Sequence, residues 1–382
     1  MKKVYIPSNL NLQTLIPAEY NNDRDLDRLH YIINLIYEQR TIYKTSQEFV
    51  PLKAIYLRSL IVRNYNDYVQ LLISKKVIAC DNHFIKNEKS FGYKLCEPYS
   101  QVKHMQVDLK SKIVQKNIEK WKLKRLPTTP VHNYLYNLLI KIEINHDEAL
   151  QQVNLLPVNE YNSSRIAIDK FKNMDFFLYS DDYGRIHTNI TNLKSSLRKF
   201  LFYGQKNLVN VDIVNSQPLL LLPTLFPSST IRCTFSKYFE NTEMDLWNYK
   251  RLVEMGKLYD YLMNYSGETD REAFKERFFR ETFFGKRTSK IFCNLFPTVA
   301  SKLLSVKAKD YRRLAWMMQR TESKLMISQI CRRLMEEYHG IFITTIHDSI
   351  LTTQENVNTV KKIMLEEFVK IGISPTIRIE QA

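Results

Sequence analysis

The sequence of 382 residues lacks the segments that place a protein in or across a membrane. It has no run of about eighteen consecutive apolar residues, the length that a transmembrane helix requires. Its first residues are positively charged but are not followed by the apolar segment of a secretion signal. The five cysteines are scattered without CxxC spacing, which argues against a zinc site and a disulfide framework. We therefore expect a cytoplasmic protein without a membrane partner.

Positive charge is what the sequence has in excess. The formal net charge is +16 and the isoelectric point is near 9.4. An excess of this size favours a polyanionic partner such as nucleic acid, although a basic surface without a specific partner is the alternative. With 44% hydrophobic and 25% charged residues, the composition is that of a globular protein. The length suits about two or three domains.

Two acidic positions stand in apolar, β-branched surroundings. Thr344–Thr353, TTIHDSILTT, predicts two short strands joined by a tight turn at His347-Asp348. Leu208–Leu220, LVNVDIVNSQPLL, predicts a strand interrupted by Asp212, a residue type that strand interiors disfavour. Two carboxylates at strand ends could hold two Mg²⁺ ions for in-line phosphoryl transfer. The alternative is that Asp348 is a turn residue and Asp212 lies at the surface.

The segments before and at Asp212 resemble those of family A DNA polymerases. Gly184–Thr188, GRIHT, with Arg198 downstream, is similar to the segment that precedes the first catalytic aspartate of that family. Asp212 followed by Ser216-Gln217 resembles motif A, although extra residues separate them. Pro218-Leu219 stands where the DNA polymerases have Ile-Glu, and that Glu excludes ribonucleotides. The resemblance therefore leaves the choice of sugar open.

Later segments extend the resemblance over about Asn173–Ala382. Asp270–Gly285 resembles motif B, with a Lys-to-aromatic spacing one residue longer than usual and Phe in place of Tyr, and is followed by Phe296-Pro297. His347-Asp348-Ser349 resembles motif C, with the Ser that is typical of phage-type single-subunit RNA polymerases. A final helix and short strand, Thr376–Glu380, are similar to the end of a family A palm. The short interval from the first to the second aspartate implies small fingers.

The resemblance implies roles for individual residues. Asp212 and Asp348, helped by the carbonyl of Ile213, would hold two Mg²⁺ ions, with Mn²⁺ as a substitute. Arg271 and Lys275 are one helical turn apart and would face the triphosphate, Lys275 as a catalytic residue. The remaining nucleotide-binding residues would be Arg277, Arg280, Phe284, Gly285 and Gln217. The residues that contact nucleic acid would be Arg185, His187, Thr188, Arg198, Gln319, Arg320 and His347.

The amino-terminal part resembles the winged helix-turn-helix domains of replication proteins. Helical spacing at Asp25–Glu38, from Pro51 to about Val62 and at Asn64–Ser74 precedes two β-rich runs, Val77–Cys80 and Phe91–Cys96. In such domains the third helix enters the major groove and the wing touches phosphates. Base contacts would then come from Asn64, Asn66 and Gln70, and phosphate contacts from Lys86, Lys89 and Lys94. The alternative is a helical module that only docks on the rest of the protein.

Gln101–Arg125 predicts a basic helix. Its lysines, among them Lys120 and Lys124, could grip a nucleic acid backbone as a thumb-like helix, or they could form a solvated face. No segment resembles a proofreading exonuclease.

We therefore expect an α+β fold in three parts. These are a winged-helix-like module at 1–97, basic linker or thumb-like helices at 98–172, and a palm at 173–382 with a fingers insertion at about 240–330. The expected function is template-directed DNA synthesis, in a bacterial or phage-infected cell, for a phage, plasmid or mobile element. Primer–template or single-stranded DNA and nucleoside triphosphates would be the partners. Alternatives are a primase or RNA polymerase that uses NTPs and has RNA as a partner, untemplated nucleotide addition, and a DNA-binding initiator with an inactive palm.

Overall fold

The computed structural model describes residues 2–43, 49–86, 88–126, 128–232 and 244–382. Asn87, at the tip between the two predicted β-rich runs, lies outside the described residues. Cys233 also lies outside them. The chain divides into two compact units, each built from three stretches. Unit 1 comprises Met1–Leu126, Glu143–Leu178 and Thr188–Phe200, and unit 2 comprises Pro127–Ile142, Tyr179–His187 and Leu201–Ala382. The units cross the divisions expected at residues 97 and 172, and the three expected parts stay predictions.

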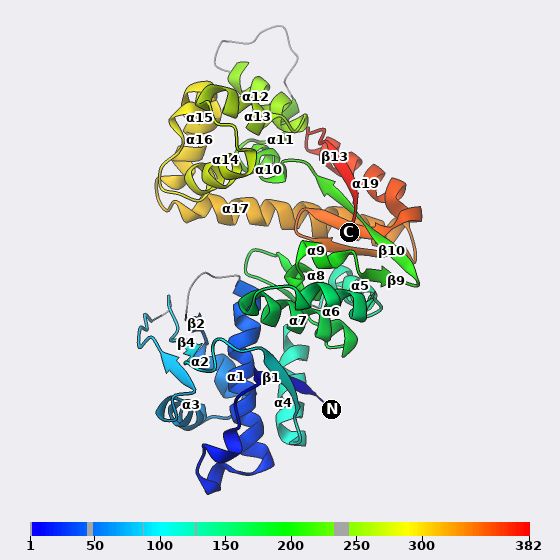
Figure 1. The fold of residues 1–382 in the computed structure, drawn as a ribbon. Helices are drawn as coiled ribbons and strands as arrows, with labels where there is room; N and C mark the ends of the chain where they lie inside the picture. The colour runs from blue at the N-terminus through cyan, green and yellow to red at the C-terminus, as the bar shows by residue number, and fades with distance from the viewer. Residues whose placement is uncertain (1, 44–48, 87, 127, 233–243) are drawn as a thin grey trace. The chain divides into compact units, whose positions relative to one another are not determined.

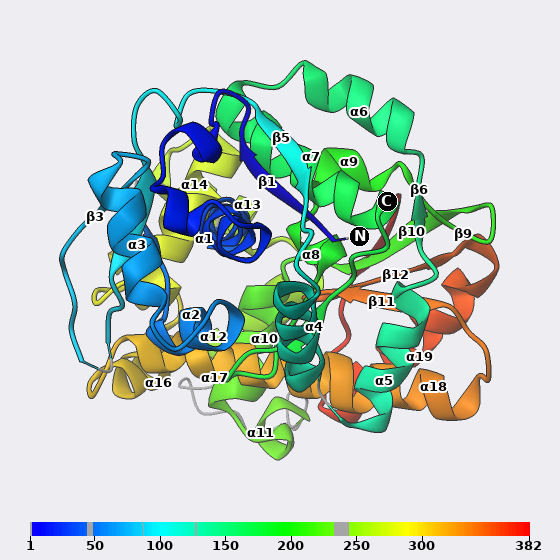
Figure 2. The ribbon, with the colours of Figure 1, turned by 90° about the horizontal axis from the view of Figure 1, so that it is seen from below.

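The amino-terminal part of unit 1 contains the predicted helices and hairpin. The strands form an antiparallel sheet in the order β2-β4-β3, and α3 packs beside β3 (Figure 2). The apolar faces of α1 and α3 meet in a core that includes Leu29, Ile32 and Leu72. The elements are α1 (Asp23–Tyr43), β2 (Val50–Pro51), α2 (Ala54–Leu60), α3 (Tyr65–Ser74), β3 (Ile78–Cys80) and β4 (Gly92–Leu95).

The predicted basic helix begins later than expected. Lys112–Arg125 is α4, but His104–Asp108 is a strand, β5, that pairs antiparallel with β1 (Lys3–Pro7). The helix predicted over residues 101–111 is therefore wrong. His104 is buried and Met105 is exposed, as alternation along a strand requires. Pairing with a segment about a hundred residues away outweighs the local helical spacing.

The rest of unit 1 is helical. The amphipathic helices α6 and α7 pack together, and two short helices follow β8. The bounds are α6 (His146–Asn154), α7 (Val158–Lys172), α8 (Asn189–Asn192) and α9 (Ser195–Arg198), with short 3₁₀ turns at Leu12–Thr14 and Ala18–Tyr20 and a short strand, β6 (Glu143–Ile144).

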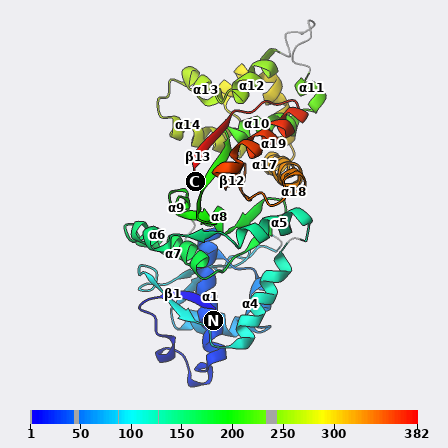
Figure 3. The ribbon, with the colours of Figure 1, turned by 90° about the vertical axis from the view of Figure 1, so that its right-hand side faces the viewer.

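Unit 2 is built around the strand β10 (Lys206–Ile213). It pairs antiparallel with β12 (Ser349–Thr353) and β13 (Ile377–Gln381), and β12 pairs in turn with β11 (Ile343–Ile346). β9 (Leu201–Tyr203) forms a hairpin with the start of β10. The helix α19 (Val357–Lys370) packs on β10 and β12 (Figure 3). The predicted hairpin at residues 344–353 and the predicted strand at residues 376–380 are confirmed.

The strand predicted at residues 208–220 ends earlier than expected. β10 stops at Ile213, and α10 begins at Ser216 after Asn215, whose φ of 55° lies in the left-handed region. The following leucines are buried along the helix rather than along a strand. An apolar run of this length does not by itself distinguish a buried strand from a buried helix.

The helices of unit 2 contain two π-helical segments. Phe279–Phe283 continues α14 (Arg271–Phe278), and Lys324–Cys331 continues α17 (Arg312–Ser323). α17 packs against α10 and α16, as Figure 1 shows. The other helices are α5 (Pro130–Leu139), α10 (Ser216–Leu225), α11 (Ser228–Arg232), α12 (Met244–Glu254), α13 (Leu258–Ser266), α15 (Lys290–Leu295), α16 (Pro297–Lys307) and α18 (Arg332–Glu337), with a 3₁₀ turn at Gln354–Asn356.

Helices and antiparallel sheets together make this an α+β protein, as predicted. Among the described residues, no helix is both long and apolar enough to cross a lipid bilayer.

Candidate active site

The two predicted aspartates lie at the same end of the sheet in unit 2. Asp212, the penultimate residue of β10, stands opposite Ser349 of β12, and Asp348 immediately precedes that serine. Opposite residues in an antiparallel pair have Cα atoms about 4.5–5.5 Å apart. The strand pairing therefore brings together two carboxylates that are 136 positions apart in the sequence.

The turn that carries Asp348 has only two residues. His347 has a φ of 55°, a left-handed conformation that such hairpin turns require and that histidine adopts more readily than most residues. The side chain of Ser216, at the start of α10, hydrogen-bonds to Asp348. Asp212 is held between the buried residues Val211 and Ile213. The backbone therefore fixes the Cα positions of both aspartates, and Ser216 helps to orient the carboxylate of Asp348.

The surroundings raise the pKa of both carboxyl groups of this pair. Burial raises the pKa of Asp212, and the charge of Asp348 raises it further, whereas Arg378 lowers it. Burial also raises the pKa of Asp348, against the hydrogen bond from Ser216 and the charges of Arg185 and Lys275. Carboxylates whose repulsion is only partly compensated are typical of sites that take a cation.

The pair fits a divalent cation that keeps other ligands. No group of three or more His, Cys, Asp or Glu side chains in the described ranges is placed to hold a metal. Mg²⁺, however, is commonly held by one or two carboxylates together with waters and substrate phosphates. The predicted third ligand, the carbonyl of Ile213, belongs to the residue that stands opposite Ile377 of β13, and its role stays a prediction.

Lys275 of α14 acts on the aspartate pair, while its neighbours on the helix are engaged elsewhere. The charge of Lys275 lowers the pKa of Asp348. Arg271 bonds to Asp260 at 3.0 Å, and Arg277 forms an ion pair with Glu268. Arg280 is exposed. Of the predicted triphosphate ligands, Lys275 is thus the one that the structure connects electrostatically with the carboxylates.

The π-helical segment lies between Lys275 and Phe284. The amide of Phe284 donates to the carbonyl of Phe279, a bond that spans five residues instead of four. A turn of this kind takes up one residue more than an α-helical turn, which matches the long spacing seen in the sequence. Phe284 has 43% of its surface exposed. At Gly285 a Cβ would meet the carbonyl oxygen of Arg280 at 2.7 Å, so that a larger residue would not fit.

The loop after this segment is held by a buried lysine. Nζ of Lys307 donates to the carbonyl oxygens of Thr282 at 2.6 Å and Gly285 at 2.8 Å. The same Nζ lies 3.4 Å from the carbonyl oxygen of Arg287. Burial lowers the pKa of Lys307 to about 8. The ammonium group therefore positions the backbone beside Phe284.

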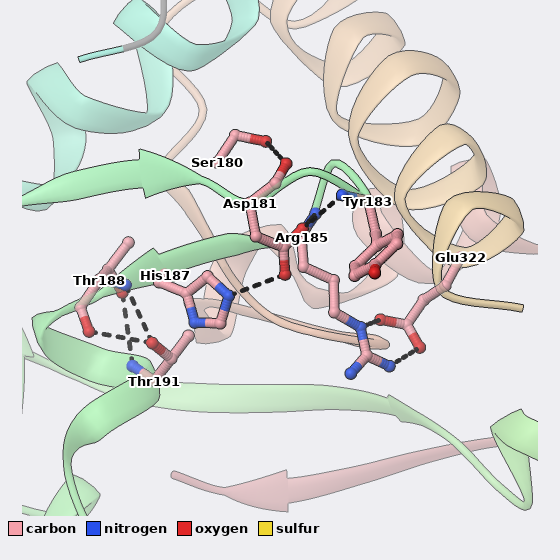
Figure 4. A network of polar contacts seen from close by, with 8 residues as sticks. All are labelled: Ser180, Asp181, Tyr183, Arg185, His187, Thr188, Thr191 and Glu322. Atoms are coloured by element: carbon pink, nitrogen blue, oxygen red, sulfur yellow. Dashed lines mark hydrogen bonds and ion pairs between the residues drawn. The ribbon is translucent and has the colours of Figure 1, made fainter. Parts of the chain in front are cut away.

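The strands β7 (Leu178–Ser180) and β8 (Ile186–Thr188) form a hairpin. Its predicted nucleic-acid ligands bond to other side chains of the protein. Arg185 donates from Nε and Nη2 to the two oxygens of Glu322, at 2.9 and 2.8 Å (Figure 4). Gln217 donates to the same carboxylate at 2.8 Å. Figure 4 also shows His187 bonded to Asp181, at 3.1 Å. Arg185 and Gln217 thus support one another through Glu322.

Other predicted ligands of nucleic acid are spread over both units. Arg320 is exposed and lies over the ring of Tyr183, which stacks on Trp316 of α17, whereas Gln319 is half-buried. The rings of His347 and His187 are 6.3 Å apart. The described geometry therefore brings His347, His187 and Arg185 to the carboxylate end of unit 2.

Thr188 and Arg198 belong to unit 1. Thr188 is buried and caps α8, where its hydroxyl accepts from the amides of Ile190 and Thr191. Lys120 and Lys124 are exposed on α4, and Lys89 pairs with Asp81 at 3.0 Å. The three residues proposed for base contacts, Asn64, Asn66 and Gln70, are exposed at and along α3.

Three residues of this region were missed in the sequence. Glu322 is 1% exposed, Lys307 is 6% exposed, and Arg378 of β13 bonds to Asp212. A charged residue on the apolar face of a predicted helix is a signal that could have identified Glu322 and Lys307. Arg378 gives no such signal, because its partner depends on the register of strands far apart in sequence.

Comparison with known proteins gives only a distant likeness. No family model and no curated protein matches the chain. One solved structure that does match is the POL domain of Pol1 from M. smegmatis in complex with DNA primer-template and dNTP. It is 10% identical, with a TM-score of 0.31 over 62% of this chain and 55% of that chain. The chain thus spans little more than half the length of that structure, and the likeness is a weak, distant one to a polymerase fold.

Proposed function

We propose that this chain is a template-directed DNA polymerase that uses dNTPs. The observation that carries the proposal is the β10–β12 register, which places Asp212 opposite Ser349 and therefore beside Asp348, with the charge of Lys275 acting on Asp348. Mg²⁺ held by the two aspartates would lower the pKa of a primer 3′-hydroxyl and neutralise the charge of the triphosphate. Mn²⁺ would serve as a substitute ion.

The chain's own residues would bind and orient the reactants. Lys275 would neutralise charge that builds on the leaving pyrophosphate. Phe284 would stack beside the nascent base pair, where an aromatic face tolerates all four bases. The Arg185–Glu322–Gln217 network would keep the hairpin and α10 in position beneath the carboxylates. In this proposal β10, β12 and β13 form a palm, and the helices from α12 to α17 form small fingers.

Unit 1 would bring the protein to DNA. The order of α1, β2, α2, α3, β3 and β4, with the sheet order β2-β4-β3, supports a winged-helix module. Residues exposed on α3 would contact bases, and the lysines of α4 would contact phosphates. Each phosphate contact would steepen the salt dependence of binding by about 0.9 in the log–log slope. A DNA-binding module joined to a polymerase suits replication of a phage, plasmid or mobile element.

The test is extension of a labelled primer–template with Mg²⁺, with dNTPs and NTPs supplied separately. We expect template-matched extension with dNTPs, and a loss of about 10³-fold in Asp348→Asn, because the variant removes a charge from the reacting centre. Asp147→Asn is the matched control, because its side chain is 90% exposed on unit 1. Its rate should equal that of the wild type.

Other outcomes would redirect the proposal. Extension with NTPs, or without a primer, would indicate a primase or RNA polymerase. Growth that ignores the template would indicate untemplated addition. DNA binding without extension under any condition would contradict the polymerase and favour a replication initiator.

A further inference from the structure

The strand β13 places an arginine directly against the first aspartate. Arg378 stands opposite Asp212 in the β10–β13 ladder, and its Nη2 donates to Oδ2 of Asp212 at 3.0 Å. Its Nε lies 3.1 Å from Oε1 of Glu380, two residues further along the strand. Residues 378 and 380 share one face of β13 because side chains alternate along a strand. The guanidinium group therefore bridges two carboxylates, one of which belongs to the predicted metal site.

The bridge is built from parts of unequal exposure. The side chain of Arg378 is 56% exposed and that of Glu380 is 47% exposed, whereas that of Asp212 is only 18% exposed. An arginine in water gains little from one ion pair, because solvent screens the charges. The less exposed Asp212, next to Asp348, gains more from a counter-ion. Water and Glu380 can replace Asp212 as partners of the exposed guanidinium, whereas the less exposed Asp212 needs another cation in its place.

The other cations near the aspartates are held differently. Arg185 is fixed by two hydrogen bonds to the buried Glu322. Lys275 acts on the other aspartate of the pair, where its charge lowers the pKa of Asp348. Arg378 differs from both because it contacts an oxygen of the pair and keeps Glu380 as a second partner. It can leave Asp212 without losing all its hydrogen bonds.

We propose that Arg378 is a displaceable counter-ion, which occupies Asp212 in the metal-free protein and is driven onto Glu380 when a divalent cation binds. This inference rests on the proposed function, since it takes Asp212 and Asp348 as the metal ligands. A divalent cation and the guanidinium compete for the same carboxylate oxygen, so that Arg378 weakens metal binding. Before the cation binds, Arg378 thereby offsets part of the repulsion between the two aspartates.

The test is a titration of the full chain with Mn²⁺, followed by calorimetry, without nucleic acid or nucleotide. Arg378→Gln should bind Mn²⁺ about three- to tenfold more tightly than the wild type, because the competing charge is gone. Arg378→Lys keeps the charge, so its Mn²⁺ affinity should remain closer to that of the wild type. A thermal unfolding transition measured for each variant checks that the fold is retained.

The matched control is Lys206→Gln. Lys206 begins β10, pairs with Glu355 at 2.7 Å and is 59% exposed, so that the variant loses one exposed, paired positive charge from the strand that carries Asp212. It is about 20 Å from Asp212 along the strand, beyond a Debye length at physiological salt. Its Mn²⁺ affinity should equal that of the wild type. Equal gains in Arg378→Gln and Lys206→Gln would overturn the inference, because net charge alone would explain them.

Asp348→Asn separates failure of this inference from failure of the proposed function. If Asp348→Asn loses Mn²⁺ binding and Arg378→Gln binds no more tightly than the wild type, only the role of Arg378 is overturned. If Asp348→Asn binds Mn²⁺ as the wild type does, the carboxylate pair is not the metal site, and both proposals fall. Binding that is detectable only in Arg378→Gln would support the competition strongly.

Discussion

In unit 1 the carboxylate of Asp169, only 2% exposed, accepts hydrogen bonds from three side chains. Arg165, His146 and Gln106 donate to it at 2.8, 2.7 and 2.6 Å. In unit 2, Asp212 and Asp348 lie beside each other, and both have a raised pKa. One unit surrounds a buried acid with donors, whereas the other places two acids together. The first arrangement stabilises a fold, and the second holds unfavourable energy that a ligand can relieve.

A second acid of unit 1 follows the same rule as Asp169. Burial would raise the pKa of Glu38, but Lys170 and Lys122 outweigh it and bring the pKa below its usual range. Lys170 bonds to Glu38 at 2.9 Å. The comparison teaches that burial of an acid is not in itself a sign of function. The sign of a functional site is a buried acid whose charge is not sufficiently compensated by nearby cations and donors.

The largest expected effect on stability separates the two kinds of acid. Asp169→Asn should lower the free energy of unfolding by about 3–5 kcal/mol, because it leaves Arg165 without its charged partner inside the protein. Asp348→Asn should leave that free energy unchanged or raise it, because it removes a repulsion. Urea denaturation of both variants measures the difference. A large loss in Asp348→Asn would show that its charge is needed for the fold, and the comparison would fail.

Lys307 gives a smaller effect, with a dependence on pH. Its pKa of about 8 in the folded protein lies below the value of about 10.4 expected for an unfolded chain. The unfolded chain thus binds more protons between these values, and the free energy of unfolding should rise with pH from about 8 to about 10. The full rise is about 3 kcal/mol. It should be absent in Lys307→Met, as chemical denaturation across this pH range would reveal.

The control for Lys307 is Lys302→Met, an exposed position on the same helix. This variant should keep the wild-type pH dependence. Parallel curves for the wild type and Lys307→Met would contradict the prediction. A confirmed rise would extend the comparison, since unit 2 would then contain a buried cation without a carboxylate partner among the described residues, as well as two acids that are only partly compensated.

Glu322 is an intermediate case and should show the smallest of these effects. Burial raises its pKa even though Arg185 and Gln217 lower it. Glu322→Gln should cost about 2 kcal/mol of stability, the value of a hydrogen bond to a charged group. In a double-mutant cycle with Arg185→Gln, the two changes should be strongly non-additive.

The exposed pair of Glu336 and Arg332, 4.0 Å apart, supplies the control for Glu322. Glu336→Gln should change stability by less than about 0.5 kcal/mol. Equal losses of stability in Glu322→Gln and Glu336→Gln would show that Glu322 contributes no more than an exposed acid. That outcome would contradict the prediction.

The sequence predicted best where the deciding contacts are local. The hairpin at residues 344–353 follows from period-two alternation and a two-residue turn, and α1 and α3 follow from the spacing of their apolar residues. β5 was predicted as helix because its partner, β1, is about a hundred residues away. The apolar run after Asp212 became α10 because Asn215 turns the chain. The first error comes from a distant strand partner, and the second comes from a left-handed residue inside the apolar run.

The two carboxylates of the candidate site were predicted from the sequence. Three charged residues near them were not. Asp212 was recognisable because strand interiors disfavour aspartate, and Asp348 because it lies in a turn between two β-branched runs, in a segment that resembles motif C. Arg378, Glu322 and Lys307 were missed because each acts through a partner more than 20 residues away. The bond between Arg185, a predicted ligand of nucleic acid, and Glu322 was missed for the same reason. Sequence patterns identify an unusual residue more readily than they identify its partner.

The π-helical turn at Phe279–Phe283 bears on how this segment tolerates change in length. A wider turn stores one additional residue without ending the helix, so an insertion here leaves the residues on either side continuous. The same turn is a place from which one residue could be removed, with the helix closing to its ordinary pitch. Such a turn therefore lets the segment gain or lose one residue while the helix continues on both sides.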